Sequence, residues 1–395
     1  METQRNKVER EILSLTEKHI ILELPTSFGK SKLALDLLNN RHIEGKILIV
    51  VPKLILIQNW KDEIAKWNYS SILKRVTFVT YVSLPKMTEH WDFIIFDEAH
   101  HLSERCLCAL REFTIDNSVL LSATLKRDKK RDISTLFRTN YRFYSVSIKE
   151  AIKEETLPDP KVILYPLSIN NDKRDRYFII KRPNAKTTIE CTFYDRFKMM
   201  NKFRVANIKV VCSAREYYVY KSNIIDGHKR KYMRNRNPMF KNIWLHACGE
   251  RLKWLSVEKQ DFVKKLLSRY SKERTLTFCS SIDQAEYLGK HCITSKNKES
   301  ESILGLFNTK KINHITACNM LDEGLNLRDC RIGIYAALSS SEIRIKQRLG
   351  RILRHKDPLI IIPYYRNTRD EEIVKDMLKD YNSDLITVED EIYNK

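Results

Sequence analysis

Two stretches of the chain share one pattern, in which short apolar runs alternate with segments of helical periodicity. In the first stretch, which ends near residue 144, the apolar runs cover residues 20–24, 46–51, 76–81, 92–96 and 118–123. Helical spacing follows the first run over residues 31–39 and the second run through Trp60 and Trp67. Continuous apolar runs of about four to six residues between helices are typical of strands that helices cover on both faces. The pattern predicts an α/β domain with a parallel sheet.

The second stretch repeats this design from residue 275 onward. Its apolar runs cover residues 275–281, 313–319, 331–338 and 358–365, and helical spacing covers residues 283–291, 344–353 and 369–381. The last helix has acidic residues in its first turn, where they complement the helix dipole. We therefore expect two α/β domains, over residues 1–150 and 273–395, separated by a linker and insertion over residues 151–272.

The expected insertion has a different texture, with polar, helix-like segments rich in Lys, Arg, Tyr and Phe. Residues 221–253 hold nine Lys and Arg against two acidic residues, a net charge of +7, interleaved with Tyr232, Phe240 and Trp244 and followed by Trp254. Cations interleaved with rings suit nucleic acid, since cations meet phosphates and rings stack on bases. The alternative is a mainly helical insertion whose aromatic residues form its own core and whose charges are solvated.

Composition narrows the class of protein. The 395 residues include 71 Lys and Arg against 50 Asp and Glu, a formal net charge of +21, which favours polyanionic partners. No uncharged apolar stretch is long enough to span a membrane, and the N-terminal residues lack the apolar region of a secretory signal. Nine scattered cysteines show no zinc or disulfide framework, so we expect reduced thiols and a cytoplasmic location, in a bacterium or a phage-infected cell.

The first candidate site lies between the first apolar run and the helix after it. Residues 24–31, LPTSFGKS, match the second half of the phosphate-loop pattern, although Leu24 stands at the first glycine position. In such a loop Lys30 contacts the β- and γ-phosphates of a nucleotide and Ser31 contacts Mg²⁺. An ordinary strand-to-helix turn with a glycine hinge is the alternative for this segment.

Two adjacent carboxylates end the apolar run at residues 92–96. A buried strand tip is a costly place for Asp97 and Glu98 unless a cation lies there. Mg²⁺ supplies that cation, with Asp97 as its ligand and Glu98 as the base that orients and deprotonates the attacking water. Without a phosphate loop nearby, a solvated turn or a helix N-cap would explain the pair.

Together these segments resemble motifs I, II and III of the superfamily 2 helicases and translocases. LPTSFGKS corresponds to motif I, DEAH at residues 97–100 to motif II, and LLSATL at residues 120–125 to motif III. Residues 50–60 and 79–84 are similar to motif Ia and the short motif after it. The resemblance implies two RecA-like domains, with ATP and Mg²⁺ bound in the cleft between them.

The second half carries the complementary motifs of the same superfamily. TFCSS at residues 277–281 resembles motif IV, NMLDEGLNL at 319–327 motif V, and QRLGRILRHK at 347–356 motif VI. By this resemblance Arg351 and Arg354 are the arginine fingers, and Gln347 lines the same site one turn earlier. Glu323 helps to couple the two sites, and Gly324 lets the backbone approach the nucleotide or the nucleic acid.

The resemblance also assigns roles to single residues elsewhere. For the nucleotide it implies Thr26, Ser27, Phe28, Gly29, Lys30, Ser31, Glu323, Gly324 and, as an adenine reader, Gln4. For coupling it implies Ser122 and Thr124. For nucleic acid it implies Pro52, Lys53, Thr80, Tyr81, Ser280 and Cys318. Two positions depart from the family pattern: Ser27 stands where relatives often have glycine, and Cys318 where many have a threonine that touches the nucleic-acid backbone.

The sequence therefore predicts a nucleic-acid-stimulated ATPase of this superfamily. A DNA helicase or branch-remodelling enzyme is favoured, because the form QRLGRILR is closer to DNA-acting relatives. A double-strand translocase that does not separate strands, an RNA helicase, and an ATPase-dead binding scaffold are the alternatives. Within the insertion, we expect five cations to contact the nucleic-acid backbone, namely Lys229, Arg230, Lys231, Arg234 and Arg236.

Overall fold

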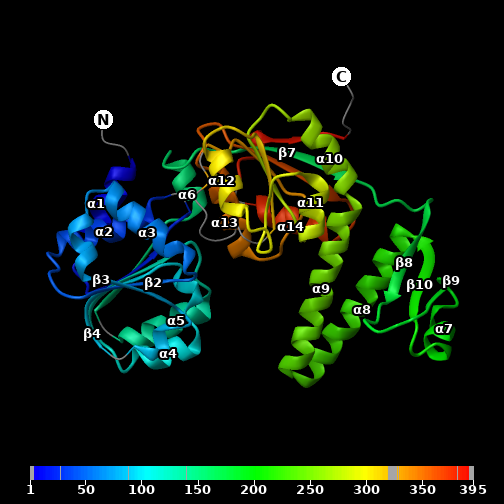
Figure 1. Cartoon of the computed structure of the whole chain (residues 1–395), viewed down its shortest axis with the longest axis horizontal. Helices are drawn as coiled ribbons and strands as arrows, with labels where there is room; N and C mark the ends of the chain where they lie inside the picture. The colour runs from blue at the N-terminus through cyan, green and yellow to red at the C-terminus, as the bar shows by residue number, and fades with distance from the viewer. Residues whose placement is uncertain are drawn as a thin grey trace.

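The structure is a computed structural model that describes residues 4–26, 28–87, 89–138, 140–318, 327, 329–379 and 381–390, with Gln4 and Glu342 described by backbone alone. Figure 1 shows three parts in a row. An N-terminal α/β domain lies at one end, a second α/β domain in the middle, and a green segment extends beyond it. We call residues 168–259, which form this segment, the insertion.

The N-terminal domain is built on a six-stranded sheet with the order β3-β2-β4-β5-β1-β6, and every pairing in it is parallel. Its elements are α1 Gln4–Leu13, β1 His19–Glu23, α2 Lys30–Asn40, β2 Ile47–Val51, α3 Ile55–Lys66, β3 Val76–Thr80, β4 His90–Phe96, α4 Glu104–Leu110, β5 Thr114–Ser122, α5 Arg127–Phe137, β6 Tyr141–Ser145 and α6 Ile148–Lys153.

Strand β2 shows why this sheet needs helices on both faces. All five of its residues are buried, and successive side chains point to opposite sides of the sheet. Ile47, Ile49 and Val51 belong to one hydrophobic cluster, while Leu48 and Val50 belong to another. The continuous apolar runs of the sequence thus supply two cores at once.

The second domain has a seven-stranded sheet with the order β12-β13-β11-β14-β15-β7-β16, again with parallel pairings throughout. Its elements are β7 Lys161–Leu167, α10 Gln260–Arg269, β11 Thr275–Phe278, α11 Ile282–Leu288, β12 Cys292–Ile293, α12 Ser300–Asn308, β13 His314–Ala317, β14 Ile332–Ile334, α13 Glu342–Ile352, β15 Leu359–Tyr365, α14 Arg369–Leu378 and β16 Ile386–Val388. The prediction of two parallel α/β domains is confirmed.

The boundaries of the second domain differ from those expected. Strand β7 pairs with β15 along its whole length, although it falls within the expected linker and insertion over residues 151–272. Helix α10 also packs on this domain, because Val263 and Leu266 share a buried cluster with Ile332 and Ile361. The chain therefore forms strand β7 of the second sheet first, then the insertion, and then the rest of the second domain from α10 onward.

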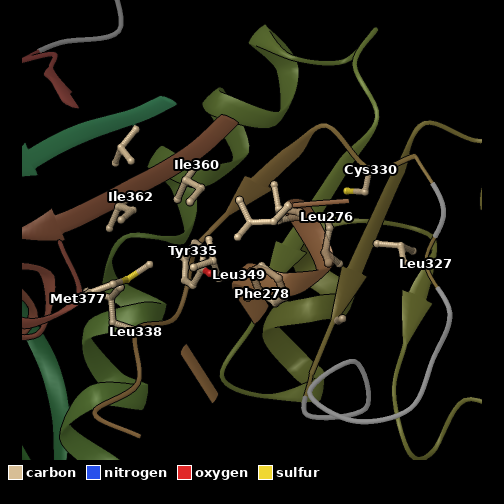
Figure 2. Close-up of a cluster of buried hydrophobic side chains, with 14 of the residues drawn as sticks. Leu276, Phe278, Leu327, Cys330, Tyr335, Leu338, Leu349, Ile360, Ile362 and Met377 are labelled. Carbon is tan, nitrogen blue, oxygen red and sulfur yellow. The ribbon is translucent and has the colours of Figure 1, made fainter. Parts of the chain in front are cut away.

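A buried cluster fixes α13 against the second sheet, as Figure 2 shows. Leu349 of this helix lies with Phe278 of β11 and with Tyr335, and the centroids of these two rings are 4.9 Å apart. At Gly333 of β14 a Cβ atom would lie 2.8 Å from Ile352, so the glycine lets the helix approach the sheet closely. The helix α13 is thus held rigidly.

The insertion consists of a small sheet and a helical hairpin. Its elements are β8 Arg174–Ile180, β9 Thr188–Thr192, α7 Arg196–Lys202, β10 Asn207–Ser213, α8 Ala214–Asn235 and α9 Pro238–Glu258. The three strands form one sheet in the order β8-β10-β9, which the expectation of a mainly helical insertion did not include. Figure 1 shows the hairpin of α8 and α9 projecting from the second domain, with the small sheet beside it at the outer end.

Capping residues fix where the two helices of the hairpin begin and where α8 ends. Ser213 and Glu216 form a capping box at the start of α8, and Arg236 ends this helix in the left-handed conformation. Asn237 then caps α9 by accepting the N–H of Met239, and Pro238 occupies the first turn. No helix in the described part of the chain has the length and apolar character needed to cross a membrane.

A buried ion pair ties the base of the hairpin to the second domain. Lys259 lies between α9 and α10, and its Nζ is 2.6 Å from Asp370 Oδ2 and 3.0 Å from the carbonyl oxygen of Pro363. Both side chains are almost fully buried. Burial makes each charge depend on the other, because neither is compensated by water.

Replacing one partner of this pair should destabilise the second domain. We expect Lys259→Met to lower the free energy of unfolding by about 3–5 kcal/mol, because it leaves the Asp370 carboxylate buried and unpaired. Urea unfolding with hydrogen exchange of α14 measures the change. The double variant Lys259→Met, Asp370→Leu should recover most of it, and a double variant as unstable as the single one would contradict the assignment.

Candidate active site

The carboxyl edge of the first sheet gathers the candidate residues in strand order. All strands run in parallel, so the segments that follow them meet at one edge. Along β3, β2, β4, β5 and β1 this edge presents, in turn, Thr80, Pro52 with Lys53, Asp97 with Glu98, Ser122 with Thr124, and the loop before Lys30. The topology thus places the two carboxylates close to the loop, with a single strand end between them.

The loop before α2 has the backbone of a phosphate loop. Gly29 adopts φ +97°, a left-handed conformation that suits glycine, and the buried Lys30 begins the helix. Lys30 Nζ donates to the carbonyl oxygen of Leu24 at 3.3 Å. Phe28 departs from its expected nucleotide role, because its ring is buried in the core and its N–H donates to Pro25.

Glu98 faces Lys30 and carries its charge inside the protein. Its Oε1 lies 3.9 Å from Lys30 Nζ and its Oε2 lies 3.3 Å from His100 Nδ1. Burial would raise the pKa of Glu98, but the charges of Lys30 and Arg351 and the bond from His100 outweigh it and lower this pKa to about 2. The carboxylate is therefore ionised, as a base that accepts a proton from water must be.

Asp97 has the opposite environment. Burial, reinforced by the charge of Glu98, raises the pKa of Asp97 to about 6. Trp60 of α3 donates its Nε1–H to Asp97 Oδ2 at 3.0 Å and favours the charged form. Trp60 is a site residue that sequence reasoning missed. In the sequence it is one more apolar position of an amphipathic helix, and only the packing of α3 on β4 reveals its donor.

The position of Tyr81 differs from the one expected. The resemblance implied a nucleic-acid contact, but the Tyr81 side chain is buried and its hydroxyl donates to the carbonyl oxygen of Asp97 at 2.7 Å. Tyr81 therefore supports the turn that presents the two carboxylates. Within that turn Glu98 adopts φ +51°, a left-handed conformation that a non-glycine residue seldom takes.

His100 connects the carboxylates to the end of β5. Its Nδ1 lies 3.3 Å from Ser122 Oγ as well as near Glu98, and Ser122 Oγ donates to the carbonyl oxygen of Thr124 at 2.9 Å. Ser122 and Thr124 are both buried, and Thr124 Oγ1 has no hydrogen-bond partner in the described structure. The His100 side chain thus lies between Glu98 and the segment that holds Ser122 and Thr124, the two expected coupling residues.

The second domain completes the site through one face of α13. Gln347 and Arg351 lie one turn apart on the helix, while Leu349 and Ile352 point into the core. Arg354, expected on the same helix face, lies in the turn after α13, which ends at Ile352. The charge of Arg351 lowers the pKa of Glu98, which places this guanidinium close to the carboxylates. Gln347 is buried, and its Nε2 finds no hydrogen-bond partner within the described residues.

A direct contact joins the two halves of the site. Thr26 Oγ1 of the first domain donates to the carbonyl oxygen of Lys346 in α13 at 3.0 Å. Gly350 lies one turn further along the helix, and a Cβ atom there would overlap the Thr26 side chain. A glycine at this position is therefore required for the phosphate loop to touch α13.

Arg354 also lies near the boundary between the two domains. Its Nη1 donates to the carbonyl oxygen of Leu327 at 3.2 Å. The Arg354 side chain is exposed; desolvation by nearby protein atoms lowers its pKa, while the charge of Glu63 in α3 raises it. Arg354 thus contacts its own domain and lies near the helix that carries Trp60.

The expected nucleic-acid residues of the motifs differ in their surroundings. Lys53 is exposed and Pro52 is half-buried, while Thr80 Oγ1 donates to Ser83 Oγ at 3.3 Å. Ser280 accepts from Ser256 Oγ at 2.6 Å and donates to Gln284, so its hydroxyl is engaged inside the domain.

Cys318 is a further correction, because its side chain is buried among hydrophobic residues at the end of β13. It therefore offers no surface to a nucleic-acid backbone. Four expected site residues lie outside what the structure describes: Ser27, Glu323, Gly324 and the side chain of Gln4.

The five cations of the insertion gather at the tip of the hairpin. Arg236 lies in the turn after α8, the other four occupy its last two turns, and all five are exposed: Lys229, Arg230, Lys231, Arg234 and Arg236. The aromatic residues point elsewhere, because Tyr232 stacks on Trp244 across the hairpin and Trp254 packs against Tyr217. The aromatic residues thus form a core of the insertion, and the charges face outward; contact of these cations with nucleic acid stays a prediction.

Both halves of the chain match models of known protein families. The family model of the type III restriction enzyme res subunit matches residues 2–127, and that of the helicase conserved C-terminal domain matches residues 258–356. A curated relative, the DNA 3'-5' translocase XPB2 of Sulfurisphaera tokodaii, is 26% identical over 367 residues, which cover 87% of this chain and 76% of the relative.

Two solved structures share the fold. The helicase domain of Hef from Pyrococcus furiosus aligns with a TM-score of 0.51 and 13% identity, covering 95% of this chain and 98% of that one. Dbp5 of S. cerevisiae, bound to RNA and ADP BeF3, aligns with a TM-score of 0.60 and 11% identity, covering 97% of this chain and 89% of that one.

The contact between Thr26 and α13 gives a sharp test of the site. We expect Gly350→Ala to separate the two halves of the site and to reduce kcat for ATP hydrolysis by about 10²-fold, since small displacements at a reacting centre have effects of that size. The matched control is Gly305→Ala in α12, where an added Cβ meets no atom within 4 Å. Equal turnover by both variants would show that this contact is not needed.

Proposed function

Because the chain is a superfamily 2 helicase or translocase, an enzyme that hydrolyses ATP, we propose that it is an ATP-driven motor that acts on DNA. The observation that carries the proposal is the ion pair of Glu98 with Lys30 in one domain, whose phosphate loop touches the helix α13 of the other through Thr26. Hydrolysis at such a site depends on the distance between the domains, so it can drive motion along a strand.

In this proposal Lys30 and the N–H groups at the start of α2 bind the β- and γ-phosphates of ATP. Glu98, ionised and 3.3 Å from His100 Nδ1, orients the attacking water and takes its proton. Arg351 and Arg354 neutralise the charge that develops on the γ-phosphate, a role typically worth about 10³ to 10⁵ in rate. Gln347, whose amide donor is buried and has no partner among the described residues, contacts the same phosphate or the water.

Magnesium fits the remaining donors. Asp97 offers a carboxylate at the strand end, and Ser31 offers a hydroxyl in the first turn of α2. Few protein ligands are typical of Mg²⁺ at such sites, where phosphate oxygens and waters complete its shell. When bound, the ion would neutralise phosphate charge. Trp60 and Tyr81 hold the Asp97 carboxylate and backbone in place for it.

The direction of the proposal toward DNA has two supports. The form QRLGRILR is closer to DNA-acting relatives, and the curated relative is named a DNA 3'-5' translocase. That name also favours a second candidate, movement along duplex DNA without strand separation. A forked duplex with a labelled strand separates the two activities, because a helicase releases the strand and such a translocase does not.

Hydrolysis by purified protein tests the central claim. ATPase rates are measured with no nucleic acid, single-stranded DNA, duplex DNA and RNA, and we expect DNA to stimulate most. Lys30→Ala and Glu98→Gln should each lower the stimulated rate by at least about 10²-fold, since they remove a phosphate contact and the base. Glu104→Gln, which alters an exposed carboxylate of α4, is the matched control. Retained turnover in Glu98→Gln would reject its role.

The hairpin tip supplies a separate DNA contact in this proposal. Reversing Lys229, Arg230, Lys231, Arg234 and Arg236 to Glu should weaken binding to duplex DNA. The salt dependence should flatten by about 0.9 log units per log salt for each phosphate that is no longer neutralised. Reversing five exposed lysines of the second domain is the control: Lys264, Lys265, Lys272, Lys298 and Lys311. Equal effects of the two sets would mean that only net charge matters.

A further inference from the structure

The small sheet of the insertion carries two large rings that point into solvent. Tyr194 is 83% exposed and Phe197 is 60% exposed. They lie three residues apart, in the turn before α7 and in its first turn. Two large rings exposed three residues apart offer apolar area that a flat ligand can cover.

The surroundings of this pair are fixed before anything binds. Thr192 Oγ1 donates to Asp195 Oδ2 at 2.7 Å and accepts the N–H of Asp195 at 3.2 Å, which closes the turn that presents Tyr194. The guanidinium of Arg196 lies 3.9 Å from the ring centroid of Phe193 and 4.5 Å from that of Phe197. One side of Phe197 is therefore backed by a cation, and the ring keeps its place.

The charge around the two rings is strongly positive. Residues 174–213 hold ten Lys and Arg against three acidic residues, a net charge of +7. Arg174 and Arg176 pair with acidic neighbours, but Lys198, Lys202 and Arg204, on α7 and just after it, are exposed and form no ion pair within the described residues. The ligand of this surface is thus an anion that also has flat apolar faces.

We propose that Tyr194 and Phe197 form a stacking platform for the unpaired bases of single-stranded DNA, whose phosphates are met by Lys198, Lys202 and Arg204. Stacking on rings beside a cationic track is the general way in which proteins hold a single strand. Duplex DNA does not fit the platform, because its base faces already stack on one another. The platform rests on the proposed function and adds that the DNA presents an unpaired strand to the insertion.

The platform is distinct from the hairpin tip. Figure 1 shows α7 at the outer end of the small sheet, and the tip of α8 and α9 at the end of the projecting hairpin. The cations of the tip meet phosphates, which duplex and single strands share, whereas the two rings meet only bases that are unpaired. A junction between duplex and single strand offers both at once.

The experiment compares two double variants of the full chain without nucleotide. Tyr194→Ala with Phe197→Ala removes both rings, and Tyr194→Phe with Phe197→Tyr keeps them. Fluorescence anisotropy measures affinity for an oligo(dT) strand and for a blunt duplex of the same length. Both rings are largely exposed, so neither change opens the core, and thermal unfolding monitors the fold of each variant.

We expect the alanine pair to weaken oligo(dT) binding by at least about tenfold, the effect that one missing base stack produces, with duplex affinity changed by less than about twofold. The ring-keeping pair should bind both as the parent does. Unchanged oligo(dT) affinity in the alanine pair, or an equal decrease on the duplex, would overturn the platform while leaving the motor intact. A parent protein that binds neither DNA would instead reject the proposed function.

Discussion

The contact between the phosphate loop and α13 is the constraint on which the site depends. Each domain alone holds half of the chemistry: the first has Lys30, Asp97 and Glu98, and the second has the cations of α13. Thr26 reaches the backbone of α13 only because Gly350 has no side chain. The helix itself cannot shift to compensate, since Leu349 and Ile352 hold it in the core and Gly333 sets its distance from the sheet. One missing Cβ thus decides how closely the phosphate loop and α13 approach each other.

The two carboxylates of the site work because their surroundings differ. Both are half-buried, and desolvation alone would favour their neutral forms. Glu98 keeps a low pKa and stays ionised because of three nearby residues: Lys30 at another strand end, His100 in its own turn, and Arg351 in the other domain. The ionised state of Glu98, which its proposed role as a base needs, therefore depends on residues of both domains.

Much of the fold and of the site could be predicted from the sequence. The features that were missed all depend on contacts between residues far apart in the sequence. Apolar runs and helical spacing predicted both sheets, because burial on two faces leaves a continuous pattern. Strand β7 escaped prediction since it lies far from its neighbours in sequence and its pairing with β15 is long-range. The roles of Trp60 and Tyr81 escaped it because each is an apolar ring with one polar atom, and the sequence does not say where that atom points.

The insertion carries most of the net positive charge and is attached firmly to the second domain. Residues 168–259 hold 22 Lys and Arg against eight acidic residues, so +14 of the net charge of +21 lies in a segment outside both sheets. Its base is fastened to the second domain by Lys259 and Asp370, and by Ser256, which bonds to Ser280 at the end of β11. The hairpin therefore turns with the second domain.

This attachment gives the hairpin a lever role. When the cleft between the domains opens or closes, residues at the edge of the first sheet, such as Lys53, stay with the first domain while the hairpin tip moves with the second. In the proposed mechanism, the distance between these two surfaces changes with each ATP, and a strand bound at both is pulled or released. Because the tip lies far from α13 in Figure 1, a small rotation at α13 would produce a larger displacement at the tip.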